Sequence, residues 1–163
     1  MERTSFLGMS CPVALALERV GEWWSILILR DATHGMTRFD EFQKSLGISP
    51  NSLTRRLNAL VEAGLLERRR YCERPPRHEY VLTEAGEAVR PVLIALYQWG
   101  ASYFPPDEVN VHLLVNETGL DVDPVLIDRA TGHPLDDEHT TFAAGPAASD
   151  LLRAALERRN NGG

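Results

Sequence analysis

The feature that most constrains the fold of this chain is one helix with clear start and stop signals, followed directly by a basic hairpin. Ser49 is a strong N-cap, because its hydroxyl can accept a hydrogen bond from a free backbone N–H of the first turn. Pro50 suits the first helical position, and Gly64 supplies the left-handed residue at which helices commonly end. These signals predict a helix from Pro50 to Ala63.

The predicted helix has an apolar and a polar face. The apolar stripe at helical spacing is Leu53, Leu57, Leu60 and Val61. At 100° per residue, the opposite face carries Asn51, Arg55, Asn58 and Glu62, flanked by Ser52, Thr54 and Ala59. Asn and Arg can bond to base edges, while Ser, Thr and Arg can hold phosphates. Such a face suits the major groove of DNA.

Two strands are predicted after this helix, Leu65 to Tyr71 and His78 to Leu82. The connecting segment, 73–77, contains paired prolines that stop the ladder from continuing. From Ser49 to His78 there are seven Arg against three Glu. A polar-faced helix followed by a basic hairpin is typical of a winged helix-turn-helix, in which the hairpin lies along the DNA backbone or minor groove.

The candidate contacts to double-stranded DNA come from this helix, from the hairpin and from the turn before them. They are Arg38, Ser49, Asn51, Ser52, Thr54, Arg55, Asn58, Arg68, Arg70, Arg74 and Arg77. An alternative is a winged-helix module that binds protein, with the basic hairpin only solvated. Arg55 exposed beside Asn51 and Asn58 favours DNA, because an apolar patch there would be expected for a protein partner.

Three shorter helices are expected before this segment, after an arm formed by residues 1–10. The first starts at Pro12 and runs to Val20. The second, Trp23 to Ala32, is apolar nearly all round and is expected to be buried, with both tryptophans in the core rather than in a ligand pocket. The third is Asp40 to Leu46. The predicted class is α+β, mainly α: a winged helix-turn-helix with a long C-terminal dimerisation helix and a small appended segment.

The dimerisation helix is expected from Thr83 to about Phe104, with Pro91 kinking it or marking its true start. Its apolar stripe is longer than a small core needs, which predicts pairing with a second copy. The expected interface residues are Val13, Leu17, Val92, Leu96, Trp99 and Tyr103.

The acidic net charge of −6 argues against a nucleic-acid binder until the chain is divided. Residues 1–104 hold 13 basic and 12 acidic residues, whereas residues 105–163 hold 4 and 11. The acidity therefore belongs to the C-terminal third, and we expect two domains, 1–104 and 105–163. Cys11 and Cys72 are too few for a disulfide framework, and no membrane span or secretory leader is evident, so we expect a cytoplasmic protein.

The acidic extension is expected to form strands at Val111 to Val115 and Val122 to Ile127, then a helix over Asp150 to Arg159 capped by Ser149. Two similar turns, centred on Thr118 and Thr131, follow the spacing of a zinc ribbon but carry threonine in place of cysteine. The histidines that could still bind a metal are His112, His133 and His139. A metal-free hairpin is the preferred interpretation, and we expect no cofactor.

The chain is not expected to be an enzyme. It shows no nucleophile and base in a recognisable constellation, no phosphate-binding loop and no thiolate metal site.

An ordered set of short motifs resembles the HxlR-type winged helix-turn-helix regulators, relatives of the MarR group, from Cys11 to about Phe104. The matching residues are Cys11-Pro12, Gly21, Trp24, Ile28-Leu29-Arg30-Asp31, Arg38-Phe39, Ile48-Ser49-Pro50, Leu53, Leu57, Ala63-Gly64-Leu65, Pro75-Pro76, Tyr80, Leu82-Thr83-Glu84 and Gly86. One departure is Trp23, where the family usually has a basic residue. The resemblance implies a homodimeric bacterial transcription regulator that dimerises through its terminal helices.

Some members of that family sense oxidants or electrophiles through a cysteine at the position of Cys11. A thiol just before a helix N-terminus is favoured as thiolate by the helix dipole, which promotes reaction. Cys11 is therefore a candidate sensor, and a small-molecule or electrophile effector is a candidate partner; the alternative is an inert, partly buried cysteine. Cys72 is expected to be incidental.

Overall fold

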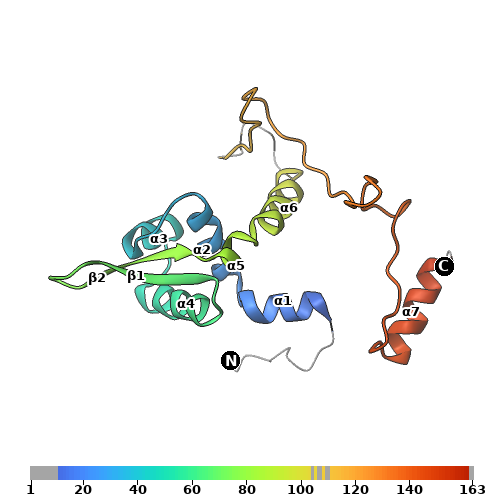
Figure 1. Ribbon diagram of the computed structural model, residues 1–163, viewed down its shortest axis with the longest axis horizontal. Helices are drawn as coiled ribbons and strands as arrows, with labels where there is room; N and C mark the ends of the chain where they lie inside the picture. The colour runs from blue at the N-terminus through green and yellow to red at the C-terminus, as the bar shows by residue number, and fades with distance from the viewer. Residues whose placement is uncertain (1–10, 104, 106–107, 109–110, 162–163) are drawn as a thin grey trace. The chain divides into compact units, whose positions relative to one another are not determined.

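The computed structural model describes residues 11–103, 105, 108 and 111–161. The chain divides into two compact units, residues 1–109 and 110–163. The first contains α1 (Pro12–Val20), α2 (Trp23–Thr33), α3 (Phe39–Leu46), α4 (Pro50–Glu62), β1 (Leu66–Cys72), β2 (Arg77–Leu82), α5 (Glu84–Glu87) and α6 (Arg90–Ala101) (Figure 1). The second contains α7 (Asp150–Asn160). The arm expected at residues 1–10 and the helix end expected at Phe104 lie outside the described residues.

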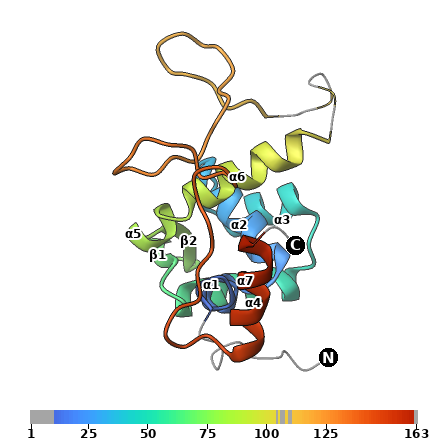
Figure 2. The same cartoon turned by 90° about the vertical axis from the view of Figure 1, so that its right-hand side faces the viewer.

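The core of the first unit lies among α2, α3, α4 and the inner end of the hairpin. Its buried hydrophobic residues are Ile28, Leu29, Phe42, Ile48, Leu53, Leu57, Leu60, Leu65, Leu66 and Tyr80. Phe39, Leu46 and Val61 are partly buried and pack against this cluster. The structure therefore confirms the apolar face predicted for α4. In Figure 2, α6 passes beside α2, which it contacts.

The predicted signals at the ends of α4 are confirmed. The Ser49 hydroxyl accepts a hydrogen bond from the Ser52 N–H at 3.3 Å, and Pro50 occupies the first turn. At the other end Gly64 has a φ of 71°, a conformation that is strained for any residue with a Cβ. These two local signals coincide with the two ends of α4.

The strands β1 and β2 form an antiparallel hairpin that extends away from the helices (Figure 1). Leu66 pairs with Leu82 and Arg70 with His78, and the register shifts between Arg70 and Cys72. Each strand lies within a residue of its predicted bounds. We call this hairpin, residues 66–82, the wing.

The segment before α3 fastens the wing to the helices. The Thr37 carbonyl accepts a hydrogen bond from the Tyr80 N–H at 2.7 Å, and Arg38 forms an isolated antiparallel bridge with Glu79. The Glu41 carboxylate accepts the N–H groups of Thr37 and Arg38, both at 2.9 Å. These backbone hydrogen bonds hold the pKa of Glu41 below its ordinary value. The turn at Thr37 and Arg38 is thus held by β2 on one side and by Glu41 of α3 on the other.

The expectation that α2 is buried all round was wrong for its first residue. Trp23 is 82% exposed, whereas Trp24 is partly buried against the core. Trp24 and Ile28 lie four residues apart and share one face of the helix, while Trp23 is rotated by about 100°. Composition alone could not distinguish the two tryptophans.

The expected long helix is divided in two. The short α5 ends at Glu87, and α6 begins at Arg90 with Pro91 in its first turn. Of the two roles predicted for Pro91, the structure therefore supports the true start of the helix. Among the described residues, no helix combines the length and apolar character that crossing a membrane requires.

The regular strands expected in the second unit were wrong. Over residues 111–161 only single bridges form, Leu114 with Asp121 and Ile127 with Pro134. Pro124 interrupts the second expected strand and has no N–H to donate to a ladder. Each bridge instead closes a short turn.

The two turns repeat the same hydrogen bonds with an offset of 13 residues. In the first turn the Gly119 N–H donates to the Val115 carbonyl at 2.8 Å, and the Leu120 N–H to the Thr118 hydroxyl at 3.3 Å. In the second turn the Gly132 N–H donates to the Asp128 backbone carbonyl at 2.8 Å, and the His133 N–H to the Thr131 hydroxyl at 3.3 Å. Each threonine hydroxyl thus acts as an acceptor within its own turn.

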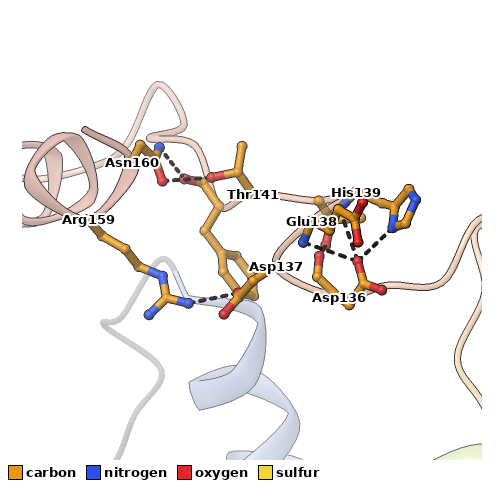
Figure 3. A network of polar contacts seen from close by, with 9 residues as sticks. Asp136, Asp137, Glu138, His139, Thr141, Arg159 and Asn160 are labelled. Carbon is orange, nitrogen blue, oxygen red and sulfur yellow. Dashed lines mark hydrogen bonds and ion pairs between the residues drawn. The ribbon is translucent and has the colours of Figure 1, made fainter. Parts of the chain in front are cut away.

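The last helix is fastened to the preceding loop by polar contacts (Figure 3). Arg159 contacts the Asp137 carboxylate at 2.7 Å, and the Thr141 hydroxyl donates to the Asn160 side-chain oxygen at 2.6 Å. The predicted Ser149 cap is confirmed, because its hydroxyl accepts the Leu152 N–H at 3.2 Å. Local polar contacts therefore define this part of the second unit.

A glycine in α5 gives a direct test of the packing between this helix and the hairpin. A Cβ at the buried Gly86 would clash with the Leu65 carbonyl oxygen and would lie 2.9 Å from Leu82 Cδ2. We expect Gly86→Ala to lower the free energy of unfolding by about 1–3 kcal/mol, the usual cost of overpacking. Urea unfolding followed by circular dichroism measures it. Gly145→Ala is the control: a Cβ there meets open space, so wild-type stability is expected. Equal unfolding curves for the two variants would contradict the close packing.

Candidate nucleic-acid interface

The polar face of α4 is presented to solvent because the opposite face is held in the core. Leu53 and Leu57 have no exposed surface, and Leu60 has almost none. The side chains of Asn51, Thr54, Arg55 and Asn58 are exposed. Together with Ala59 and Glu62 they line a shallow, open hollow along the helix. All of the candidate base-reading residues from the sequence therefore lie on one accessible surface.

The first turn of α4 adds hydroxyl groups to this surface. The Ser49 hydroxyl accepts the Ser52 N–H and donates to the Ser52 hydroxyl at 3.0 Å. These contacts orient both serines at the N-terminus of the helix. Such a terminus favours an anion such as a phosphate.

One face of the wing carries Arg68, Arg70 and His78. Side chains alternate along a strand, so Arg68 and Arg70 share the face of Leu66, whose side chain is buried in the core. His78 lies opposite Arg70, and its ring nitrogen is 3.5 Å from an Arg68 guanidinium nitrogen. Burial, followed by the charges of Arg68 and Arg70, lowers the pKa of His78. The arginines, not the histidine, supply the positive charge of this face near neutral pH.

Two wing arginines, Arg69 and Arg70, are partly neutralised by neighbouring carboxylates. Arg69 contacts Glu67 at 2.8 Å, and Arg70 contacts Glu73 at 3.3 Å. The hydrogen bond to Arg69 lowers the pKa of Glu67 and, reciprocally, raises that of Arg69. Both pairs are exposed, so each contributes little to stability.

The tip of the wing carries charge that is free of such partners. Within the described part of the chain, neither Arg74 nor Arg77 forms an ion pair, and both side chains are exposed. Arg55 on α4 is in the same situation. These three guanidinium groups are therefore available to an anionic ligand.

Arg38 lies beside the wing and not on α4. Its guanidinium carbon is 5.0 Å from the centre of the Tyr71 ring, a cation–π arrangement. The bridge between Arg38 and Glu79 fixes its backbone there. The structure thus brings Arg38 to the hairpin, whereas the sequence placed it only in a turn.

Sequence reasoning missed one charged residue of α4. Arg56 is buried on the core side of the helix, where it forms an ion pair with Glu22. The helical spacing already indicated that Arg56 is buried, because position 56 lies three residues after Leu53 and four before Leu60, on the apolar stripe.

The expected dimer residues are exposed in the single chain. They are Val13 and Leu17 on α1, Val92, Leu96 and Trp99 on α6, and Tyr103 just after it. Trp99 is 65% exposed, and its ring meets that of Tyr103 edge to face with centroids 5.4 Å apart. Exposed aromatic and aliphatic side chains on neighbouring helical turns form a surface suited to another protein.

The two cysteines differ in their surroundings. Cys11 is exposed at the N-cap position of α1, and its carbonyl accepts the Leu15 N–H at 3.0 Å. Cys72 is partly buried near the wing tip, with its sulfur 3.7 Å from the Arg74 carbonyl oxygen.

The candidate metal ligands of the second unit are separated into pairs. His112 contacts Asp121 at 3.0 Å, and His139 contacts Asp136 at 2.7 Å. The rings of His133 and His139 stack with centroids 4.8 Å apart. Among the described residues, no group of three or more His, Cys, Asp or Glu side chains is placed to hold one ion.

Comparison with known proteins agrees with this geometry. The family model described as HxlR-like helix-turn-helix matches residues 19–108. The chain is 42% identical over 144 residues to the uncharacterised HTH-type transcriptional regulator Rv3095 of Mycobacterium tuberculosis, covering 88% of this chain and 91% of the relative. The family model thus spans α2 to α6, including the wing.

Two solved structures are also similar. PA1607, described as a proposed transcription factor, is 46% identical with a TM-score of 0.75, covering 87% of this chain and 100% of that chain. The redox regulator HypR in its reduced form is 32% identical with a TM-score of 0.54, covering 56% and 92% respectively. The chain therefore belongs to the HxlR family of helix-turn-helix transcriptional regulators, with a MarR-like winged-helix fold.

Proposed function

We propose that this regulator binds a specific double-stranded DNA site as a homodimer, with α4 in the major groove. The observation that carries the proposal is the exposed face of Asn51, Thr54, Arg55 and Asn58, held outward by a buried apolar stripe. Arg pairs with the acceptors of guanine and Asn with the edge of adenine, so this face has the chemistry of base recognition.

The wing supplies the sequence-independent part of binding. Arg74 and Arg77 at its tip are exposed, and Arg68 and Arg70 line one face. Ser49 and Ser52 sit at the helix N-terminus, where a phosphate is favoured. Arg38, beside the wing, is a further backbone contact. Contacts to phosphates fix the register of the protein on the duplex, and base contacts then specify the sequence.

A second copy accounts for the exposed apolar side chains of α1 and α6. The residues proposed to become buried in the dimer are Val13, Leu17, Val92, Leu96, Trp99 and Tyr103. A two-fold dimer presents two copies of α4 to half-sites about one helical turn, or a multiple of it, apart. A regulator that binds DNA in this way acts in the cytoplasm, the compartment we expect from the sequence.

Cys11 is proposed as an oxidant- or electrophile-responsive residue of this dimer. It is exposed, and it lies at the start of a helix whose dipole favours a thiolate. The similarity to a protein described as a redox regulator supports the idea. Because α1 is a proposed dimer helix, a modification at its first turn would alter the spacing of the two α4 helices.

The first prediction separates base reading from backbone contact. The probe is a duplex selected by the wild-type protein from a random-sequence library, compared with unselected DNA. Arg55→Ala should cost about 1–3 kcal/mol on the selected duplex and little on unselected DNA. Arg74→Ala should weaken both and reduce the salt dependence of binding. Arg129→Ala, an exposed arginine of the second unit, is the charge-matched control. Equal losses on both duplexes for Arg55→Ala would reduce it to a phosphate contact.

The second prediction concerns assembly. Light scattering should show a wild-type dimer at micromolar concentration. Leu96→Asp should release monomers or unfold the chain, because it places an unpaired charge in an apolar interface. Gln98→Asp adds the same charge to an exposed polar position of α6 and should remain dimeric. A folded wild-type monomer would refute the dimer.

The third prediction concerns the thiols. A thiol oxidant or a small electrophile should change the affinity of the wild-type protein for its selected duplex. Cys11→Ser should not respond, and Cys72→Ser should respond like wild type. The same change in wild type and Cys11→Ser would show that Cys11 is not the sensor.

A further inference from the structure

The buried side of α4 carries one charged side chain, Arg56, among apolar core residues. Arg56 Nη2 donates to Glu22 Oε2, and the Arg56 side chain is only 9% exposed against 47% for Glu22. Arg56 Nε is also buried, and it has no hydrogen-bond partner among the described residues. Its neighbours on the stripe, Leu53, Leu57 and Leu60, are all apolar.

Stability alone does not explain this pair. Removing a guanidinium from water costs free energy that a single partner only partly returns, and an apolar residue of similar volume commonly stabilises a fold as well or better. What an ion pair adds is a defined geometry between its partners, because one Arg56 nitrogen donates to one Glu22 oxygen. The pair therefore sets the position of α4 relative to the residue that holds that carboxylate.

Glu22 stands at the junction between α1 and α2. The preceding Gly21 has a φ of 85°, and its N–H closes α1 by donating to the Leu17 carbonyl at 2.8 Å. The Glu22 carbonyl starts α2 by accepting the Ser25 N–H at 2.8 Å. Among the described residues of α1 none is buried, so this helix reaches the core mainly through its last residue, Val20, and this junction.

We propose that Glu22 and Arg56 are positioning residues that couple the orientation of α1 to that of α4. The inference rests on the proposed homodimeric DNA binding, in which α1 belongs to the dimer interface. The Glu22 carboxylate, at the junction between α1 and α2, holds the buried side of α4, where Arg56 is next in sequence to the exposed Arg55. The pair thereby fixes the geometry between the dimer and each recognition helix, and so the half-site spacing that the dimer accepts.

Half-site spacing is the property that tests this coupling. The wild-type protein first selects duplexes with paired half-sites from a random-sequence library. The selected site is then rebuilt with its half-sites moved apart or together by successive base pairs. Affinities are measured for the wild type, Glu22→Ala, Arg56→Met and the double variant. Asp137→Asn, which removes the carboxylate paired with Arg159 in the second unit, is the matched control.

We expect wild type and the control to lose roughly tenfold or more in affinity at the wrong spacing, a change of the size that coupled contacts produce. Both single variants should lose less than about threefold, and the double variant should behave like the singles because they break the same link. Discrimination between bases within a half-site should persist in all of them, since Arg55 is untouched. A residue that only stabilised the fold would lower the urea midpoint without relaxing the spacing.

The outcomes separate the inference from the function on which it rests. If wild type selects no paired half-sites, the proposed dimeric DNA binding fails. If it does, and folded single variants keep the wild-type spacing profile, the coupling is refuted and the function stands. If a single variant does not fold, the double variant decides, because it removes both charges. Failure of the double variant to fold would also refute the inference, since the pair would then be required by the core.

Discussion

Burial of the apolar stripe of α4 is the interaction on which the rest of the first unit depends. Leu53, Leu57 and Leu60 each gain about 1.5–3 kcal/mol on leaving water, and they pack against residues from α2, α3 and the wing. Because the helix is amphipathic, anchoring this side forces Asn51 and Arg55 outward. The rotation of the recognition surface therefore follows from the core.

The wing depends on that core as well. A two-stranded hairpin is marginal by itself in water, and this one is anchored by buried Leu66 and Tyr80 at its inner end. The hydrogen bond from Tyr80 to Thr37 adds a third backbone segment. The strand register then separates the charges: Arg69 meets Glu67, whereas Arg74 and Arg77 project from the tip. An element that contacts the DNA backbone needs a rigid attachment to the protein and a positively charged outer end, and the wing has both.

The described part of the second unit is held together by polar contacts and not by a hydrophobic core. Among its described residues no hydrophobic side chain is buried, and Phe142 and Leu151 are about four-fifths exposed. Its shape comes from hydrogen-bonded turns, a capped helix and the contact between Asp137 and Arg159. Side-chain hydroxyl and carboxylate groups accept backbone N–H groups within the two turns. One of them is the Asp128 carboxylate, whose pKa is lowered mainly by its hydrogen bonds to Thr131. The acidity of this region would repel phosphates, which leaves the proposed DNA contacts to the first unit.

The sequence by itself determined the elements whose signals are local. The Ser49 cap, the left-handed Gly64, the apolar stripe of α4 and the basic hairpin all follow from spacing and backbone preference, so the winged-helix class and the polar face of α4 could be predicted. Tertiary structure alone decided which side of α2 is buried, and hence why Trp23 is exposed and Trp24 is not. It also decided that Arg56 pairs with Glu22, 34 residues away. Charge pairing and burial depend on neighbours distant in sequence, and periodicity along one helix contains no information about which residue of another element will meet it.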